Sequence, residues 1–326
     1  MQFIPFSKEY LPHIIRLLEP GVENVDNLLP FYSEQFAAYS GPGDACLLLK
    51  SEEQLLVCVH LIAGGEGRYI LRLGKADDLD ESYWHNVWHQ CCATIGELVS
   101  APVTVQTLIE AESPLAGKLN EIGFSQVREL VEMSYSLDKL PATTTQMEGF
   151  SMVSLKQAPE LAPKWIELFN QGMSGVYGIP PWDHAQFERR RQAPGFKPER
   201  WQLGYSNGQP LVALYHEPRD VEIGDARLYL TTINRSKSFT RKVLYDVLAV
   251  LKEQQLSQVN MLFDTQNQAT NLMFKLAGFE PRRKYYLLEA AATASQAAAT
   301  SDTDADLPEI DGFYGRSFHN FSSQKK

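Results

Sequence analysis

The residues best suited to chemistry lie between positions 228 and 289. An apolar strand is expected at residues 228–233, and it leads into the cationic, hydroxyl-rich loop Asn-Arg-Ser-Lys-Ser-Phe-Thr-Arg at residues 234–241. A strand followed by such a loop and then a helix directs free backbone N–H groups and the positive end of the helix dipole toward one point. This pattern predicts a phosphate or pyrophosphate site. A second strand at residues 258–264 and a helix at residues 267–278 follow.

The order of these elements resembles the acyl-CoA-binding half of the GCN5-related N-acetyltransferase (GNAT) family. In that family the loop typically reads Arg/Gln-x-x-Gly-x-Gly/Ala, and the closing helix reads Asn-x-x-Ala-x-x-Leu-Tyr-x-x-x-Gly-Phe. Asn267 and Gly278 match this pattern. Ser238 and Thr240 stand where the family has glycines, and Phe274 stands where it usually has tyrosine.

The resemblance implies acetyl-CoA or another acyl-CoA as co-substrate, with its pantetheine arm on the strand and its pyrophosphate at the loop. Side chains at Ser238 and Thr240 reduce how closely the backbone can approach the pyrophosphate, but they supply hydroxyl donors and cap helices well. The alternative is an ordinary strand and a capped helix with a solvated basic face. The cofactor-binding positions implied are Thr231, Thr232, Ile233, Arg235, Ser236, Lys237, Ser238, Phe239, Thr240, Arg241, Asn267 and Phe274.

Acyl transfer to an amine needs a proton acceptor, because only the neutral amine attacks the thioester. The candidate bases are His216 and Glu217, at the end of a strand expected in the second half, and His184. Each also fits the alternative of a surface or edge residue. Phe274 lacks the phenol that protonates the departing thiolate in many relatives, but a thiolate is a tolerable leaving group near neutral pH.

The acceptor pocket of the resembled fold lies between the first two helices of the acyl-CoA-binding half, which corresponds to residues 172–182 here. Three glycines in this segment favour mobility, while Tyr177 and Trp182 would form an aromatic lip against a substrate. The alternative is a rigid connector that is packed by its aromatic residues.

The element order repeats along the chain. The Gly-Phe pair at Gly123 mirrors the pair at Gly278, an offset of 155 residues. Each half is expected to form a strand, two helices, three strands, a helix, a strand, a helix and a strand. The fold class expected is therefore α/β, with two tandem acetyltransferase-like (GNAT) domains, each a mixed, mostly antiparallel sheet flanked by helices.

The first copy is degenerate at its anion loop, where four acidic residues lie between positions 77 and 81. Their charge would repel a cofactor, or it simply complements the dipole of the next helix. The expected divisions are residues 1–140 for a degenerate acetyltransferase-like domain, 141–149 for a linker, 150–290 for the acyl-CoA-binding domain, and 291–326 for a low-complexity linker and aromatic tail.

The charge distribution supports one anionic cofactor in the second half. Residues 1–145 hold 9 Lys and Arg against 20 Asp and Glu, whereas residues 146–290 hold 18 against 15. A net charge of −10 argues against nucleic acid as a partner.

Four cysteines without paired spacing predict reduced, buried thiols and no metal site. The absence of a signal-like start or a long apolar run predicts a cytoplasmic protein without a membrane partner.

These observations predict an acyl-CoA-dependent N-acyltransferase, in the first place an N-acetyltransferase, that acts on a small amine. The alternative is a non-catalytic GNAT-fold protein with a binding or regulatory role, which the missing glycines and tyrosine favour. Transfer from charged tRNA is disfavoured, because the acidic chain has no extended basic stripe. The aromatic tail predicts docking onto a domain or onto a second copy in a homodimer.

Overall fold

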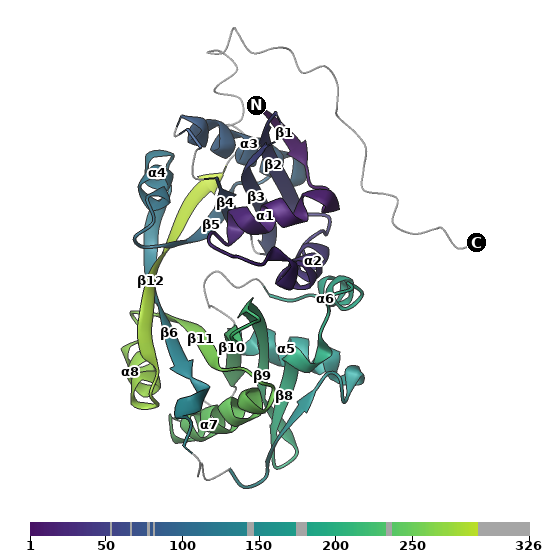
Figure 1. Cartoon of the computed structure of the whole chain (residues 1–326), viewed down its shortest axis with the longest axis vertical. Coiled ribbons are helices and arrows are strands. Elements are labelled where there is room, and N and C mark those ends of the chain that lie inside the picture. The colour runs from purple at the N-terminus through teal and green to yellow at the C-terminus, as the bar shows by residue number, and fades with distance from the viewer. Residues whose placement is uncertain are drawn as a thin grey trace, which may run out of the picture.

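The computed structural model describes residues 1–52, 54–65, 67–76, 79–80, 82–141, 147–173, 181–232 and 237–292, with the backbone alone for residues 237–240. Each half contains the expected elements in the expected order (Figure 1). In the first half these are β1 (Gln2–Pro5), α1 (Leu11–Leu18), α2 (Leu29–Ala38), β2 (Ala45–Ser51), β3 (Gln54–Gly65), β4 (Arg68–Lys75), α3 (Tyr83–Leu98), β5 (Val103–Glu110), α4 (Leu115–Glu121) and β6 (Ser125–Ser136). In the second half they are β7 (Phe150–Ser154), α5 (Ala162–Met173), α6 (His184–Arg191), β8 (Trp201–Ser206), β9 (Gln209–Asp220), β10 (Asp225–Thr232), α7 (Lys237–Glu253), β11 (Gln258–Asp264), α8 (Gln268–Leu276) and β12 (Glu280–Ala292).

Local sequence explains why these elements form where they do. α7 places Val243, Val247 and Leu251 on one buried face at intervals of four residues, as an amphipathic helix requires. Asn207 and Gly208 have φ angles of 50° and 76°, and they make the tight hairpin turn between β8 and β9 that an Asn-Gly pair predicts. The expected elements therefore follow from hydrophobic spacing and turn chemistry.

The two expected sheets are joined into one sheet of twelve strands. Its order is β1-β2-β3-β4-β5-β12-β6-β11-β10-β9-β8-β7 (Figure 1). Of the strand pairs in the described sheet, β4–β5 and β10–β11 are parallel and the others are antiparallel. The same order read from either edge passes through equivalent strands of the two halves.

The last strand of each half pairs with the other half. β12 lies against β5, and β6 lies against β11, while β6 and β12 pair with each other at the centre of the sheet. Leu288 and Ala290 of β12 are buried in the core of the first half, and Met133 and Tyr135 of β6 are buried in the core of the second. Each core is therefore completed by a strand from the other half.

This exchange is symmetric about the middle of the sheet. Tyr285 of β12 lies opposite Leu130 of β6, and these two residues are counterparts at the 155-residue offset of the repeat. Two counterparts that face each other place a local two-fold axis at that point. Equivalent surfaces of the two halves therefore lie on the same face of the sheet.

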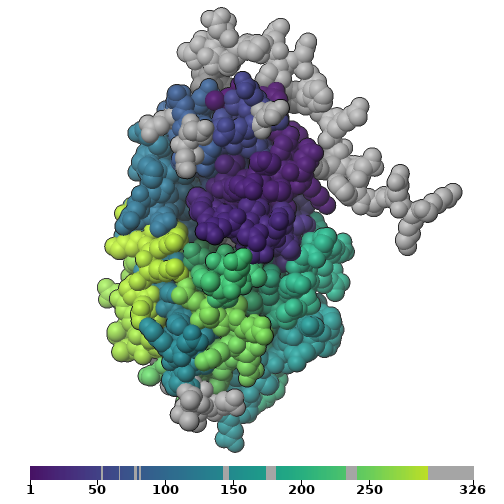
Figure 2. All heavy atoms as spheres, viewed as in Figure 1, coloured from purple at the N-terminus to yellow at the C-terminus, as the bar shows by residue number. Residues whose placement is uncertain are grey.

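Helices cover both faces of the sheet. Leu228 packs in the core beneath α7 and α8, whereas its neighbour Tyr229 packs in the core beneath α5, as the alternation along a strand requires. The α5 core also includes Ala38 and Tyr39 from the first half, where α2 lies beside α6 (Figure 1). The space-filling view shows the purple and green halves in contact there (Figure 2). None of the helices in the described part of the chain has the length and apolarity to cross a bilayer.

A pair of introduced cysteines tests the strand exchange. Thr104 and Ala291 are Cα partners across β5 and β12, so cysteines at these positions should form a disulfide on mild oxidation. Without the exchange, β12 would lie against β11, where Gln258 is the equivalent of Thr104. Cysteines at Gln258 and Ala291 are therefore the matched control, and they should stay reduced. Peptide mapping by mass spectrometry gives the answer, and a cross-link in the control pair alone would contradict the exchange.

Candidate functional site

The parallel strands β10 and β11 separate at the centre of the second half. They pair at only three positions, of which the last is Arg227 opposite Asn260. β10 nevertheless continues to pair with β9 as far as Thr232. Backbone groups of residues 228–232 that face β11 therefore have no strand partner within the described sheet. We call this opening the fork, and its vertex lies at Arg227 and Asn260.

A helix N-terminus follows the fork directly. β10 ends at Thr232, and the 17-residue helix α7 begins at Lys237. The first N–H groups of such a helix have no partner inside the helix, and they point back toward the preceding strand. The described part of the site thus contains the unpaired edge of β10, followed along the chain by the N-terminus of α7. The predicted cofactor residues Ile233, Arg235 and Ser236 lie outside the described residues, as do the side chains of Lys237, Ser238, Phe239 and Thr240.

Helix α5 lies against the open strand on the other face. Thr231 is buried, and its hydroxyl lies where a side chain at Gly172 would have to go. Only glycine at position 172 allows this close approach of α5 to β10. The Thr231 side chain therefore packs against α5 and helps to position this helix. A ligand at the fork would contact the backbone of β10 rather than the Thr231 hydroxyl.

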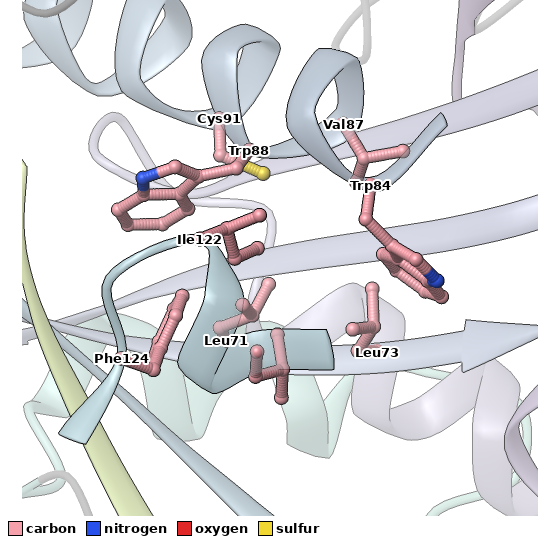
Figure 3. Close-up of a pocket in the computed structure, with 9 residues that line it drawn as sticks. Leu71, Leu73, Trp84, Val87, Trp88, Cys91, Ile122 and Phe124 are labelled. Atoms are coloured by element: carbon pink, nitrogen blue, oxygen red, sulfur yellow. The ribbon is translucent and has the colours of Figure 1, made fainter. Parts of the chain in front are cut away.

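The first half contains an equivalent fork beside a packed apolar core. β4 and β5 also separate after three residue pairs. The space beside β4 is occupied by Trp84 and Trp88 of α3, and the Trp88 ring lies 4.8 Å from that of Phe124 (Figure 3). The apolar space left there is about 10 Å³, which is at the lower limit for one water molecule and offers it no polar lining.

The acidic loop of the first half is described at one of its four acidic residues. Asp77, Asp78 and Glu81 lie outside the described residues. The Asp80 carboxylate accepts a hydrogen bond of 2.8 Å from the backbone N–H of Ser82, directly before α3. This contact fits the interpretation that the acids complement the start of the helix.

A buried polar network connects the two halves beside the fork. Glu217 on β9 accepts hydrogen bonds from Gln35 Nε2 at 2.7 Å and from the Tyr229 hydroxyl at 3.0 Å. Arg190 of α6 lies 3.7 Å from Glu217 and donates to Glu34 at 2.5 Å. Because Glu34 and Gln35 belong to α2, this network joins the first half to the second.

The network keeps Arg190 charged and Tyr229 protonated. Burial acts to lower the pKa of Arg190, but the carboxylates of Glu34 and Glu217 outweigh it, so that the pKa is raised and the guanidinium stays charged. Burial, followed by the charge of Glu217, raises the pKa of Tyr229, and the phenol stays protonated as a donor. Both oxygens of Glu217 are therefore engaged, which makes this predicted base a structural acceptor in the arrangement seen.

A second part of the network lies at the vertex of the fork. Glu132 of β6 is fully buried, and its Oε1 accepts from Arg219 at 2.8 Å and lies 3.7 Å from Arg227. Arg227 also bonds to Tyr229, which links the two parts. Among the described residues, Glu132 Oε2 has no hydrogen-bond partner. An unpaired buried acceptor costs roughly 1–3 kcal/mol, so a ligand N–H group would be stabilised here.

The three predicted bases lie apart. His216 points to the face of β9 opposite Glu217, where its Nε2 lies 3.3 Å from Gln254 Oε1. Burial, followed by the charge of Arg200, lowers its pKa from 6.5 to about 4, so the imidazole is neutral at pH 7. His184 is exposed at the first position of α6. Only Glu217 of the three belongs to the network beside the fork.

The remaining predicted residues have structural contacts. The Trp182 ring is buried in the α5 core, and its backbone is held by Asn170, while Tyr177 lies outside the described residues. Asn267 caps α8 by accepting from the Thr270 N–H group at 3.2 Å. Further contacts are those of Phe274, whose buried ring packs on Phe263 and Phe279, and of Arg241, which lies 6.0 Å from the Tyr245 ring.

Comparison with known proteins gives a match at the level of structure. No model of a protein family matches the sequence, and neither does a curated protein. A GCN5-related N-acetyltransferase from Sphaerobacter thermophilus matches with a TM-score of 0.61 and 16% identity, over 89% of this chain and 96% of that chain. A tandem GNAT protein from the clavulanic acid biosynthesis pathway matches with a TM-score of 0.59 and 13% identity, over 89% and 98%. The chain has the tandem GNAT fold.

Other proteins of known structure extend this likeness. Saccharomyces cerevisiae N-myristoyltransferase with bound myristoyl-CoA matches with a TM-score of 0.61 and 13% identity, over 90% of this chain and 78% of that chain. The GNAT fold predicted from the sequence is thus confirmed along most of the chain. At such low identity the likeness concerns the fold.

Sequence reasoning missed the charged residues at the vertex of the fork. Glu132 lies between Val131 and Met133 in a strand that also contains Arg128 and Glu129, so its carboxylate does not stand out in the sequence. Arg227 and Tyr229 are two residues apart on β10, so their side chains lie on the same face of the strand. Without the exchange of β6, no pattern in the sequence connects Glu132 to the second half.

Protonation of His216 at low pH should reduce the stability of the folded protein. Its pKa is lower in the folded protein than the usual 6.5, so the unfolded chain binds more protons between pH 6.5 and about 4. The free energy of unfolding should therefore fall as the pH falls through this window, with a slope of up to ~1.4 kcal/mol per pH unit from this residue. Urea unfolding of His216→Gln should show a shallower decline, and the exposed His184→Gln control an unchanged one. Equal slopes in all three proteins would contradict a buried neutral imidazole.

Proposed function

We propose that this chain is an acyl-CoA-dependent N-acyltransferase that acts on a small amine, with acetyl-CoA as the first candidate donor. The observation that carries the proposal is the fork, where an open edge of β10 leads within a few residues to the N-terminus of α7. The pantetheine arm would pair with residues 228–232. The diphosphate would lie at the start of α7, near residues 233–241.

The chemistry follows from this placement. The neutral amine attacks the thioester carbon, and a backbone N–H of β10 stabilises the oxyanion of the tetrahedral intermediate. The C–N bond forms, the C–S bond breaks, and the proton lost by nitrogen ends on the thiolate, which gives an amide and CoA. Phe274 is packed in the core and supplies no proton, which the moderate basicity of a thiolate makes tolerable.

The two halves have different tasks in this proposal. Four acidic residues lie between positions 77 and 81, directly before α3, so the cofactor is assigned to the second half alone. The first half contributes α2, whose Glu34 and Gln35 hold the network beside the open fork. Its acidic charge fits a half that holds no polyphosphate.

A non-catalytic GNAT-fold protein is the second candidate. Ser238 and Thr240 replace the loop glycines of the resembled family, and Phe274 replaces its tyrosine. Such a protein would keep the fold and bind a different ligand. Binding of acyl-CoA distinguishes the two candidates.

Binding should be visible as thermal stabilisation. Acetyl-CoA should raise the melting temperature in a saturable way, since a ligand at 100 times its Kd stabilises the folded state by ~2.7 kcal/mol. The Ser238→Glu variant should lose this rise, because a carboxylate at the start of α7 repels the diphosphate. Ser82→Glu is the matched control, as Ser82 is the residue before α3 in the first half, and its rise should equal that of the unmodified protein.

A longer donor such as octanoyl-CoA is measured in parallel, because the acyl length is open. The absence of any rise with either donor at millimolar concentration would contradict the proposal and favour the non-catalytic protein.

A further inference from the structure

The network beside the fork carries more positive than negative groups. Hydrogen bonds and ion pairs connect Glu132 through Arg227, Tyr229 and Glu217 to Arg190 at the other end. Within the described residues, the network joins three carboxylates to five guanidinium groups. These belong to Glu34, Glu132 and Glu217, and to Arg72, Arg190, Arg200, Arg219 and Arg227. An excess of buried positive charge favours the binding of an anion.

The excess reaches solvent at the vertex of the fork. Glu132 is 0% exposed, whereas the side chains of Arg219 and Arg227, which contact it, are 22% and 28% exposed. Arg227 Nε is itself buried and has no hydrogen-bond partner among the described residues. Arg200 is similarly exposed but lies near Glu34, at the far end of the network. Of the five guanidinium groups of the network, those of Arg219 and Arg227 therefore lie at the vertex and are partly exposed to solvent.

An acceptor for hydrogen bonds lies next to these two cations. Glu132 Oε2 is without a partner within the described structure, while its Oε1 is bound by Arg219. A ligand that satisfies both features needs an N–H group for Glu132 and an anion for the arginines. The two groups must lie close together, since Arg227 is 3.7 Å from Glu132.

We infer that the amine acylated by this protein also carries a carboxylate, as an amino acid does. Arg219 and Arg227 bind the carboxylate, and Glu132 Oε2 accepts a hydrogen bond from the amine nitrogen and orients it toward the thioester at the fork. This inference rests on the proposed acyltransferase function and names the class of its acceptor.

The strand exchange brings residues of both halves into the proposed acceptor site. Glu132 belongs to β6, the last strand of the first half, whereas Arg219 and Arg227 belong to β9 and β10 of the second. The acceptor site is therefore built from both halves. The first half thus contributes a substrate-binding group to the site of the second half.

Matched amines test the class of acceptor. The release of CoA thiol from acetyl-CoA, or from octanoyl-CoA if only that donor binds, is measured with the twenty amino acids, β-alanine and γ-aminobutyrate, and with their methyl esters. An ester keeps the amine and removes the carboxylate charge. We expect at least one free acid to be acylated with a kcat/KM at least about tenfold above that of its ester.

Variants of Arg219 and Glu132 test whether these residues cause the preference for the free acid. Arg219→Gln should reduce the preference for the free acid over its ester toward one, mainly through KM. Arg191→Gln is the matched control, because Arg191 is 47% exposed on α6 and its guanidinium lies 2.7 Å from Glu188 rather than beside Glu132. Glu132→Gln should lower kcat/KM for acid and ester alike, while the thermal shift with acyl-CoA remains. Arg219 is partly exposed, so its variant tests the inference even if Glu132→Gln fails to fold.

The outcomes separate this inference from the proposed function. Turnover of esters as fast as of free acids, or acyl-CoA binding without acylation of any carboxylate-bearing amine tested, contradicts the inference and leaves acyl-CoA binding intact. An unchanged preference in Arg219→Gln also contradicts it. The absence of both acyl-CoA binding and turnover contradicts the proposed function itself.

Discussion

The structure depends on the exchange of β6 and β12 between the two halves. Each of these strands supplies apolar residues to the core of the other half, for example Leu288 to the first and Met133 to the second. Antiparallel pairing on both sides of each strand fixes its register, because a slip by one residue would turn its buried side chains to the opposite face. The sheet is therefore continuous, and the position of one half relative to the other is set by backbone hydrogen bonds.

The same exchange explains why charged residues gather beside the fork. Ion pairs removed from water recover their desolvation cost only when their geometry is good, so they are weak evidence of stability. Here Arg190 lies between Glu34 of one half and Glu217 of the other, and it packs 4.8 Å from the Trp201 ring. The network continues to Glu132 at the vertex, where one carboxylate oxygen stays unpaired. We interpret the buried charges as a means of fixing two surfaces around a site.

Much of the fold was predictable from the sequence, whereas the composition of the site was not. Hydrophobic spacing, the Asn207–Gly208 turn and the two Gly-Phe pairs specify the order of elements and the repeat. The exchange was not predictable, because the alternation along β6 and β12 buries the same residues whichever sheet edge they join. Trp182 was expected at a substrate lip, yet it is buried between α5 and α6, since its spacing fits either place. The loop at residues 233–236 lies outside the described residues, so its predicted cofactor contacts stay predictions.

The central claim is that the fork between β10 and β11 holds the arm of an acyl-CoA. A crystal structure of the protein grown with CoA tests it most directly. We predict continuous density for pantetheine along residues 228–232 and for the diphosphate at the start of α7, with the thiol near Arg227 and Glu132. CoA bound elsewhere, or a fork closed by side chains in the presence of saturating CoA, would contradict the claim.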